Sequence, residues 1–199
     1  MNDYTEIAVI LDRSGSMGSI RDDAIGGFNT FLESQKAVPG EAKFTLVLFD
    51  HEYDTVMLRK DLHEAEPLSA KTYVPRGSTA LLDAIGRTVN AVGAQLAALP
   101  EGERPTKVIV AILTDGMENA SREFSRPQIA EMVKHQEETY SWEFIYLGAN
   151  QDAFAVGGEL GMRAANIANF ASTGVGTRSA YDTVDRLTTS YRTARREEK

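Results

Sequence analysis

Short apolar runs alternate along the chain with longer segments whose apolar residues have helical spacing. The runs are rich in Val and Ile, are bounded by polar residues and show no regular alternation with them. This pattern is typical of strands that are buried on both faces of a parallel sheet. The predicted buried strands are Ile7–Leu11, Phe44–Phe49, Val108–Leu113 and Phe144–Leu147.

Two further segments are predicted as strands of a different kind. Tyr53–Leu58 is more polar and follows the turn-like Asp50-His51-Glu52, which indicates a hairpin and an antiparallel strand at the edge of the sheet. Asn166–Phe170 is predicted as one more short strand, after a loop that follows Phe144–Leu147.

Four helices are predicted between and after these strands. Apolar residues three and four positions apart draw one stripe down a helix. Such stripes are Ile20, Ala24, Phe28, Phe31; Leu82, Ile85, Val89, Val92, Leu96, Leu99; and Tyr181, Val184, Leu187, Tyr191. Ser125-Arg126-Pro127-Gln128 matches a capping box with proline in the first turn, and predicts the start of the helix that carries Ile129 and Val133.

The order of these elements predicts an α/β fold: a doubly wound, mostly parallel sheet with one antiparallel edge strand and helices on both faces. No stretch resembles a linker, so residues 1–199 are predicted to form a single domain. In open parallel sheets, ligands bind beside the carboxyl ends of the strands. The residues that directly follow each strand are therefore the candidates for a functional site.

Composition narrows the classes of function. The 199 residues include no cysteine, which excludes disulfides, thiol catalysis and Cys-ligated zinc. The formal net charge of −8 disfavours nucleic-acid binding, which depends on neutralising phosphates. The longest apolar runs have five and six residues, whereas a membrane-spanning helix needs about 20. No basic leader precedes the first run, and we therefore expect a cytoplasmic protein that does not engage a membrane.

The turn after the first strand offers oxygen atoms alone. Asp12, Ser14 and Ser16 stand at alternate positions, so that one carboxylate and two hydroxyls can point to the same side. Hard divalent cations such as Mg²⁺ prefer such ligands. The simpler interpretation is a strand-to-helix turn whose serines cap the helix and whose aspartate complements the helix dipole.

Two more segments place oxygen ligands at the same edge. Thr114-Asp115-Gly116 ends the strand Val108–Leu113, and Thr79 stands near the start of the helix that begins around Leu82. Taken separately, Asp115 fits an ordinary strand-end turn and Thr79 a helix cap. Together with Asp12, Ser14 and Ser16 they give five oxygen-bearing side chains around a candidate cation site.

Weaker candidates lie near this edge. Asp50 ends the second strand and either forms the hairpin turn or contributes to the site. Glu118 and Asn119 follow Asp115 and are candidates for contacts around the metal ligands or at the rim. Residues 148–152 follow another strand at this edge and could shape a surface for specificity, although ordinary loop chemistry also accounts for them.

The combination of Asp12-Arg13-Ser14-Gly15-Ser16, Gly77-Ser78-Thr79 and Thr114-Asp115-Gly116 resembles the von Willebrand factor A domain family, whose hallmark is the metal-ion-dependent adhesion site. The resemblance covers nearly the whole chain, and all five residue types of the motif are present. It implies that Asp12, Ser14, Ser16, Thr79 and Asp115 hold Mg²⁺, or Mn²⁺ or Ca²⁺, with one aspartate acting through water.

The resemblance also implies a function. In this family the cation keeps an open side, and an Asp or Glu of a protein partner completes its ligands. Stand-alone bacterial members often work beside AAA-type ATPases, which gives a class of partner. The expected function is a metal-dependent protein-interaction module without catalytic activity.

Two other functions use the same fold. A Mg²⁺-dependent hydrolase or phosphoryl-transfer enzyme could use the same carboxylates. The sequence has no phosphate-binding loop of the Gly-x-x-x-x-Gly-Lys-Ser/Thr type and no Gly-x-Ser-x-Gly elbow, and we expect no histidine near the motifs to activate a serine. A nucleotide-binding protein is disfavoured because Gly15 and Gly18 do not form the Gly-x-Gly-x-x-Gly motif.

Overall fold

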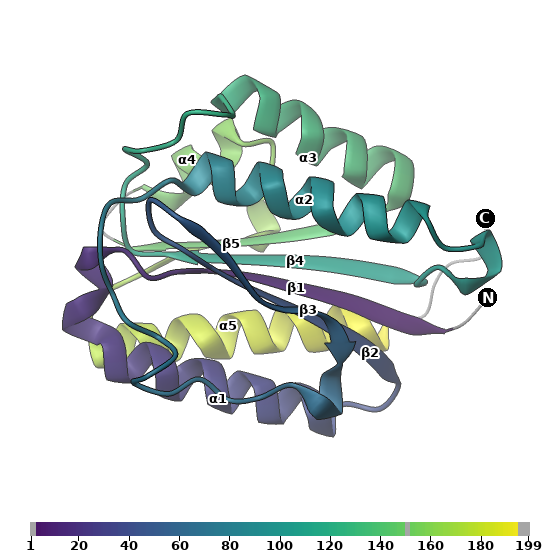
Figure 1. The fold of residues 1–199 in the computed structure, drawn as a ribbon, viewed down its shortest axis with the longest axis horizontal. Helices are drawn as coiled ribbons and strands as arrows, with labels where there is room; N and C mark the ends of the chain where they lie inside the picture. The colour runs from purple at the N-terminus through teal and green to yellow at the C-terminus, as the bar shows by residue number, and fades with distance from the viewer. Residues whose placement is uncertain (1–2, 150–151, 195–199) are drawn as a thin grey trace.

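A six-stranded sheet in the order β3-β2-β1-β4-β5-β6 runs through the middle of the structure, a computed structural model that describes residues 3–149 and 152–194 (Figure 1). Its strands are β1 (Tyr4–Asp12), β2 (Glu41–Phe49), β3 (Tyr53–Asp61), β4 (Lys107–Thr114), β5 (Glu143–Ala149) and β6 (Ile167–Phe170). Neighbouring strands are parallel except β2 and β3, which are antiparallel. This is the predicted sheet, with the antiparallel strand at its edge.

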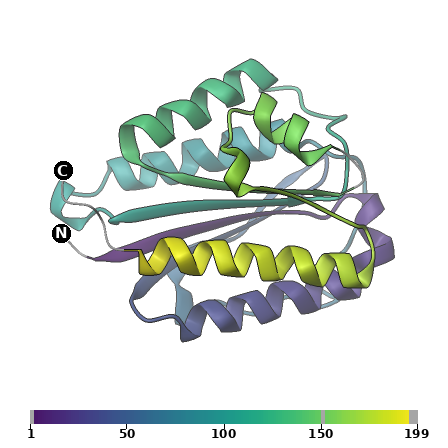
Figure 2. The same ribbon diagram turned by 180° about the vertical axis from the view of Figure 1, so that it is seen from behind.

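Helices cover both faces of the sheet (Figures 1 and 2). The helices are α1 (Arg21–Ala37), α2 (Leu81–Ala97), α3 (Arg126–Tyr140), α4 (Ala153–Glu159) and α5 (Gly174–Thr193), with short 3-10 turns η1 (Gly15–Ile20), η2 (Leu62–Glu64), η3 (Glu101–Glu103) and η4 (Ala164–Asn166). One buried cluster joins α1 and α5 to one face, and a second joins α2, α3 and α4 to the other. Both faces of β1 are therefore buried, as its continuous apolar run predicts.

The sequence-based prediction was incomplete at the end of the chain. The segment expected to be a loop after the fifth strand contains α4, whose seven residues include two alanines and two glycines and carry too little apolar periodicity to be recognised. Asn166 belongs to η4 rather than to the last strand. The capping box is confirmed, because Gln128 Oε1 accepts hydrogen bonds from the backbone N and the Oγ of Ser125, both at 2.8 Å.

The register of the central strands decides what meets at the carboxyl edge of the sheet. Leu11 of β1 pairs with Leu48 of β2 on one side and with Leu113 of β4 on the other. The residues that follow these three positions, Asp12, Asp50 and Asp115, therefore reach the same edge, at the left of Figure 1.

Among the described residues, no helix combines the length and the apolar character that a membrane-spanning segment requires.

The last helix packs directly on the first. α5 lies along α1 on one face of the sheet (Figure 2). The ring of Tyr181 occupies the space beside Gly27, where an added Cβ would lie 2.2 Å from Cδ2 of the ring. At the far end, the buried guanidinium of Arg192 donates hydrogen bonds to the backbone oxygens of Gln35 (2.6 Å) and Gly40 (3.0 Å), at the end of α1. Close approach at Gly27 and capping by Arg192 fix α5 at two points.

Neighbouring glycines of α1 give a matched test of this packing. We expect Gly27→Ala to lower the free energy of unfolding by about 1–3 kcal/mol, because the ring of Tyr181 must move. Gly26→Ala meets no atom within 4 Å and should raise it by about 0.5–1 kcal/mol, because alanine loses less backbone entropy in a helix. Urea unfolding of both variants measures the difference; equal effects would show that Tyr181 does not depend on Gly27.

Candidate functional site

Asp12, the last residue of β1, has a fully buried side chain whose two oxygens both accept hydrogen bonds. Oδ1 accepts from the backbone N of Ser14 and Oδ2 accepts from Oγ1 of Thr114, each at 2.6 Å. Thr114 ends the neighbouring strand β4 and bonds in turn to the backbone of Gly116. The carboxylate is thus oriented by its own turn and by the adjacent strand.

The two serines of the first motif connect Asp12 to the second carboxylate. Ser14 Oγ lies 3.1 Å from Ser16 Oγ, and Ser16 Oγ donates to Asp115 Oδ1 at 2.5 Å. Ser172, which stands just before α5, donates to the other oxygen of Asp115 at 3.3 Å. Three segments far apart in the sequence therefore meet at one carboxylate.

Thr79 reaches the same place from the loop before α2, beside Gly116. A Cβ added to Gly116 would lie 2.6 Å from Thr79 Oγ1, 3.3 Å from Ser14 Oγ and 3.4 Å from Asp12 Oδ2. Because glycine has no Cβ, three side-chain oxygens converge on this point without obstruction. The structure thus brings all five predicted residues into one cluster; that they bind a metal stays a prediction.

The electrostatics of the cluster favour a bound cation. Burial raises the pKa of Asp12 to about 6, although hydrogen bonds from Thr114 and Ser14 act in the opposite direction. Burial also raises the pKa of Asp115, against hydrogen bonds from Ser16 and Ser172. Among the ion pairs formed by residues 3–149 and 152–194, none includes Asp12. A divalent cation would offset the cost of burying this charge.

The donor set also limits the kind of metal site. Within the described part of the chain, no group of three or more His, Cys, Asp or Glu side chains is placed to hold a metal ion. Hydroxyl oxygens must therefore supply part of any metal site at this edge. Two carboxylates with three hydroxyls form an all-oxygen set of the kind that suits Mg²⁺, Mn²⁺ or Ca²⁺.

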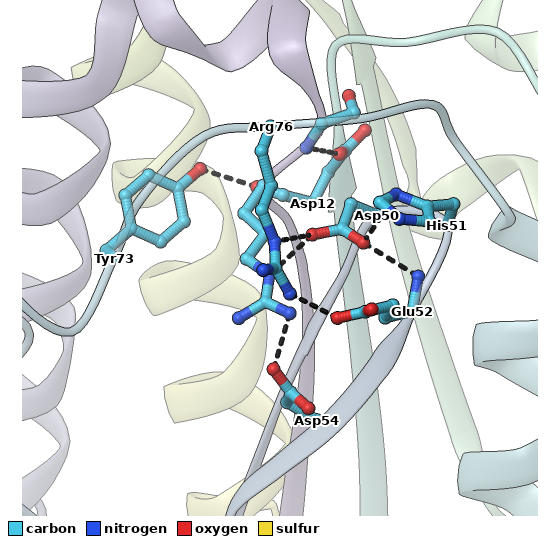
Figure 3. A network of polar contacts seen from close by, with 9 residues as sticks. Asp12, Asp50, His51, Glu52, Asp54, Tyr73 and Arg76 are labelled. Atoms are coloured by element: carbon cyan, nitrogen blue, oxygen red, sulfur yellow. Dashed lines mark hydrogen bonds and ion pairs between the residues drawn. The ribbon is translucent and has the colours of Figure 1, made fainter.

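Asp50 is the centre of a second, separate network (Figure 3). Its fully buried Oδ2 accepts hydrogen bonds from Nε of Arg13 (2.9 Å) and Nε of Arg76 (3.0 Å), and its Oδ1 accepts from the backbone N of Glu52 at 2.7 Å. Burial raises the pKa of Asp50, but these hydrogen bonds and charges outweigh it and hold the pKa below its ordinary value. Arg13 and Arg76 also pair with the more exposed Asp54 and Glu52, respectively.

This network fixes the loop that carries Thr79. The backbone N of Arg76 donates to Arg13 O at 2.8 Å, and the backbone N of Ala80 donates to Asp50 O at 2.8 Å. The buried hydroxyl of Tyr73 donates to the backbone oxygen of Asp12 at 2.5 Å (Figure 3). The loop is thus attached to the ends of β1 and β2 on both sides of Thr79, and Asp50 acts by positioning it.

Glu118 and Asn119 also contact backbone rather than the centre of the cluster. Asn119 Oδ1 accepts from the backbone N of Thr79 at 2.9 Å. Glu118 Oε2 accepts from the backbone N of Leu82 at 2.9 Å, in the first turn of α2, and Oε1 accepts from the backbone N of Ser121 at 2.8 Å. Both side chains therefore hold the segment after Asp115 against the segment that contains Thr79.

Several contributors to the site were not predicted from the sequence. Thr114 stands in one of the motifs, but the sequence alone gives it no role. No sequence pattern points to Tyr73, Arg76 or Ser172, because each of them contacts residues that are far away in the sequence. One histidine does lie near the motifs, although among the described residues no hydrogen bond joins it to a serine that it could activate. The exposed ring of His51 lies against Gly77, where an added Cβ would be 2.1 Å from Nδ1, and Nδ1 lies 3.1 Å from Asp50 Oδ1. Of the predicted specificity segment, residues 150–151 lie outside the described residues.

Similar solved structures carry von Willebrand factor A domains. They include a von Willebrand factor type A protein from Catenulispora acidiphila (11% identity, TM-score 0.59, 96% of this chain and 43% of that chain). Another is proximal thread matrix protein 1 from the mussel byssus with a zinc-occupied MIDAS motif (16% identity, TM-score 0.59, 94% and 46%). A third is the vWF domain of the type V pili tip protein Mfa5 from Porphyromonas gingivalis (12% identity, TM-score 0.59, 100% and 99%).

The extent of these similarities differs. The chain spans less than half the length of the first two structures but nearly all of the third. At sequence identities of 11% to 16%, these structures show a similar fold and nothing further. No protein-family model matches the sequence, and no curated protein matches it.

The burial of Asp12 predicts a pH-dependent stability in metal-free protein. Because the folded-state pKa is raised to about 6 from 3.8, the charged carboxylate destabilises the folded state progressively as the pH rises from about 4 to 6, and the loss is complete above pH 6. We expect Asp12→Asn to stabilise the metal-free protein by about 1–3 kcal/mol near pH 7, and by much less at about pH 4. Urea unfolding in EDTA measures both values. A variant that is less stable than wild type near pH 7 would contradict the expected cost.

Gly116 gives a second prediction. We expect Gly116→Ala to lower the affinity for Mg²⁺ roughly tenfold or more, because its Cβ would press on Thr79 Oγ1. Gly18→Ala is the matched control, since Gly18 lies in η1, close to the motif, and meets no atom within 4 Å. Calorimetric titration of both variants measures the effect; unchanged affinity in Gly116→Ala would place any metal elsewhere.

Proposed function

Because the chain has the von Willebrand factor A fold, we propose that residues 1–199 form a single domain that binds proteins through a divalent metal ion. Asp12, Ser14, Ser16, Thr79 and Asp115 would hold the ion. When bound, the cation supplies an electrophilic centre that accepts one more oxygen ligand. We propose Mg²⁺ as that ion, with Mn²⁺ or Ca²⁺ as alternatives.

The observation that carries this proposal is the convergence of oxygens around Gly116. Oγ1 of Thr79, Oγ of Ser14 and Oδ2 of Asp12 all lie within 3.4 Å of the point where a Cβ of this glycine would be. The chain's own residues prepare the site before any ligand arrives: Thr114 orients Asp12, Ser172 contacts Asp115, and Asn119 holds the backbone of Thr79. Such preorganisation reduces the cost of binding.

The partner we propose is a protein that presents an Asp or Glu to the metal. A carboxylate is a charge-assisted ligand for a hard cation, and the two carboxylates of the site leave the cation close to neutral rather than over-compensated. AAA-type ATPase systems are the class of partner that we propose, on the resemblance to stand-alone bacterial members of the family.

Catalysis is the alternative. The Asp50–His51 pair beside Gly77 places a titratable ring near the loop of Thr79, which favours a Mg²⁺-dependent hydrolase or phosphoryl-transfer enzyme. Among the described residues, however, no hydrogen bond joins His51 to a serine, and Asp50 is already held by two arginines. Turnover of p-nitrophenyl phosphate in Mg²⁺ that is lost in Asp12→Ala would support the alternative over the interaction module.

Calorimetric titration of chelator-treated protein tests the metal site. We expect saturable binding of Mg²⁺ or Mn²⁺ to wild type, and a loss of roughly tenfold or more in Asp12→Ala and Asp115→Ala, because each variant removes a ligand oxygen and its charge. Asp182→Ala, which removes an exposed carboxylate of α5, is the matched control and should bind like wild type. Folded wild type without saturable binding, or full affinity in Asp115→Ala, would overturn the proposal.

A further inference from the structure

Exposed apolar side chains gather at the edge of the sheet that carries the candidate metal site. Among the described residues, the large apolar side chains that are exposed are Val56, Leu58, Val74, Met117, Tyr140, Phe154 and Val175. Three of these seven, Met117, Phe154 and Val175, follow the carboxyl ends of the parallel strands β4, β5 and β6. A fourth, Val74, lies in the loop before α2, which is bonded to the end of β1 through Tyr73 and Arg76. These four side chains are between 50% and 73% exposed. We call these four residues the apolar rim.

Two residues of the apolar rim are tied closely to Asp115. Met117 is two residues after Asp115, so their Cα atoms lie within about 8 Å of each other. Val175 is three residues after Ser172, whose hydroxyl donates to Asp115 at 3.3 Å. Both residues therefore belong to segments that meet at Asp115.

The other two residues extend the rim to either side. Val74 follows Tyr73, whose hydroxyl contacts the backbone of Asp12 at 2.5 Å, on the side of β1 and β2. Phe154 follows Ala153, whose backbone N donates to Asn169 Oδ1 at 2.8 Å, on the side of β5 and β6. The site lies over β1 and β4, and so the apolar rim reaches past it in both directions along the edge.

The charges near the site favour one kind of partner. Arg13 and Arg76 both pair with the buried carboxylate of Asp50, so these two arginines are already engaged inside the chain rather than offered to a polyacidic segment. The net charge of −8 repels such a segment as a whole. Large apolar side chains around a single metal-binding point instead match a partner with one carboxylate and apolar neighbours, and exposed methionine adapts to varied apolar surfaces.

We infer that the apolar rim selects a protein segment in which one Asp or Glu stands between large apolar residues. The inference rests on the proposed function, since the carboxylate is the group that would reach the metal. The apolar neighbours would pack on Met117 and Val175 in the middle of the edge. Burial of about 50 Å² of apolar surface would tighten binding roughly tenfold.

Three short peptides test this inference. They share blocked ends and differ at the centre: Leu-Glu-Leu, Ser-Glu-Ser and Leu-Gln-Leu. The protein carries ¹³C-methyl methionine, and the methyl signal of Met117 reports contact with the peptide in Mg²⁺ and in EDTA. We expect Leu-Glu-Leu to bind roughly tenfold more tightly than Ser-Glu-Ser in Mg²⁺, and Leu-Gln-Leu to be much weaker than Leu-Glu-Leu.

Two valine variants test whether the apolar rim causes the preference for Leu-Glu-Leu. Val175→Ser should reduce the preference for Leu-Glu-Leu to roughly threefold or less, because it removes part of the apolar rim. Val56→Ser, on the exposed edge strand β3, is the matched control and should leave the preference unchanged.

The other outcomes separate the inference from the proposed function. Equal affinity for Leu-Glu-Leu and Ser-Glu-Ser, or equal effects of the two valine variants, would overturn the inference and leave metal-dependent binding standing. Equal affinity for Leu-Gln-Leu and Leu-Glu-Leu would also overturn it, because the apolar surface would then act without the carboxylate. If no glutamate peptide binds while calorimetry shows the metal bound, the proposed function is wrong and the inference falls with it.

Discussion

The parallel pairing of β1 with β4 is the constraint on which the candidate site depends. Because Leu11 stands opposite Leu113, the carboxylates of Asp12 and Asp115 leave the sheet at the same edge, and both are buried. Burial of carboxylates at one place costs free energy, which is visible in the raised pKa values of both groups. Backbone and hydroxyl donors from neighbouring turns offset part of this cost, and a cation would offset more.

The pKa values of two buried aspartates at this edge are shifted in opposite directions. Asp50 is held by two arginines, and its pKa lies below the ordinary value. Asp12 accepts hydrogen bonds from neutral groups, and its pKa is raised to about 6. A carboxylate whose charge is balanced within the chain suits a structural role, whereas one that is solvated by neutral donors suits a ligand that brings positive charge. Asp50 therefore has a structural role, whereas the environment of Asp12 is consistent with the metal site that we propose.

The sequence predicts the parts of this molecule that depend on local pattern. The buried apolar runs mark four strands, and apolar spacing marks α1, α2 and α5, because these patterns follow directly from which faces are buried. The five oxygen-bearing residues could be found because they stand at strand ends or near a helix start. The helix α4 was missed because its short, glycine-containing segment has little periodicity. Contacts such as those of Ser172 with Asp115 and of Arg76 with Asp50 depend on how distant loops meet, which no local pattern records.

The most direct test of the central claim is an anomalous difference map from crystals of the protein soaked in Mn²⁺. The account predicts one strong peak beside Gly116, in contact with side-chain oxygens of Thr79 and Ser14 and next to Asp115. A peak elsewhere would contradict it, for example in the groove between α1 and α5 that is lined by Asp22, Asp23, Asp182 and Asp185. A well-ordered edge without any peak beside Gly116 would contradict it equally.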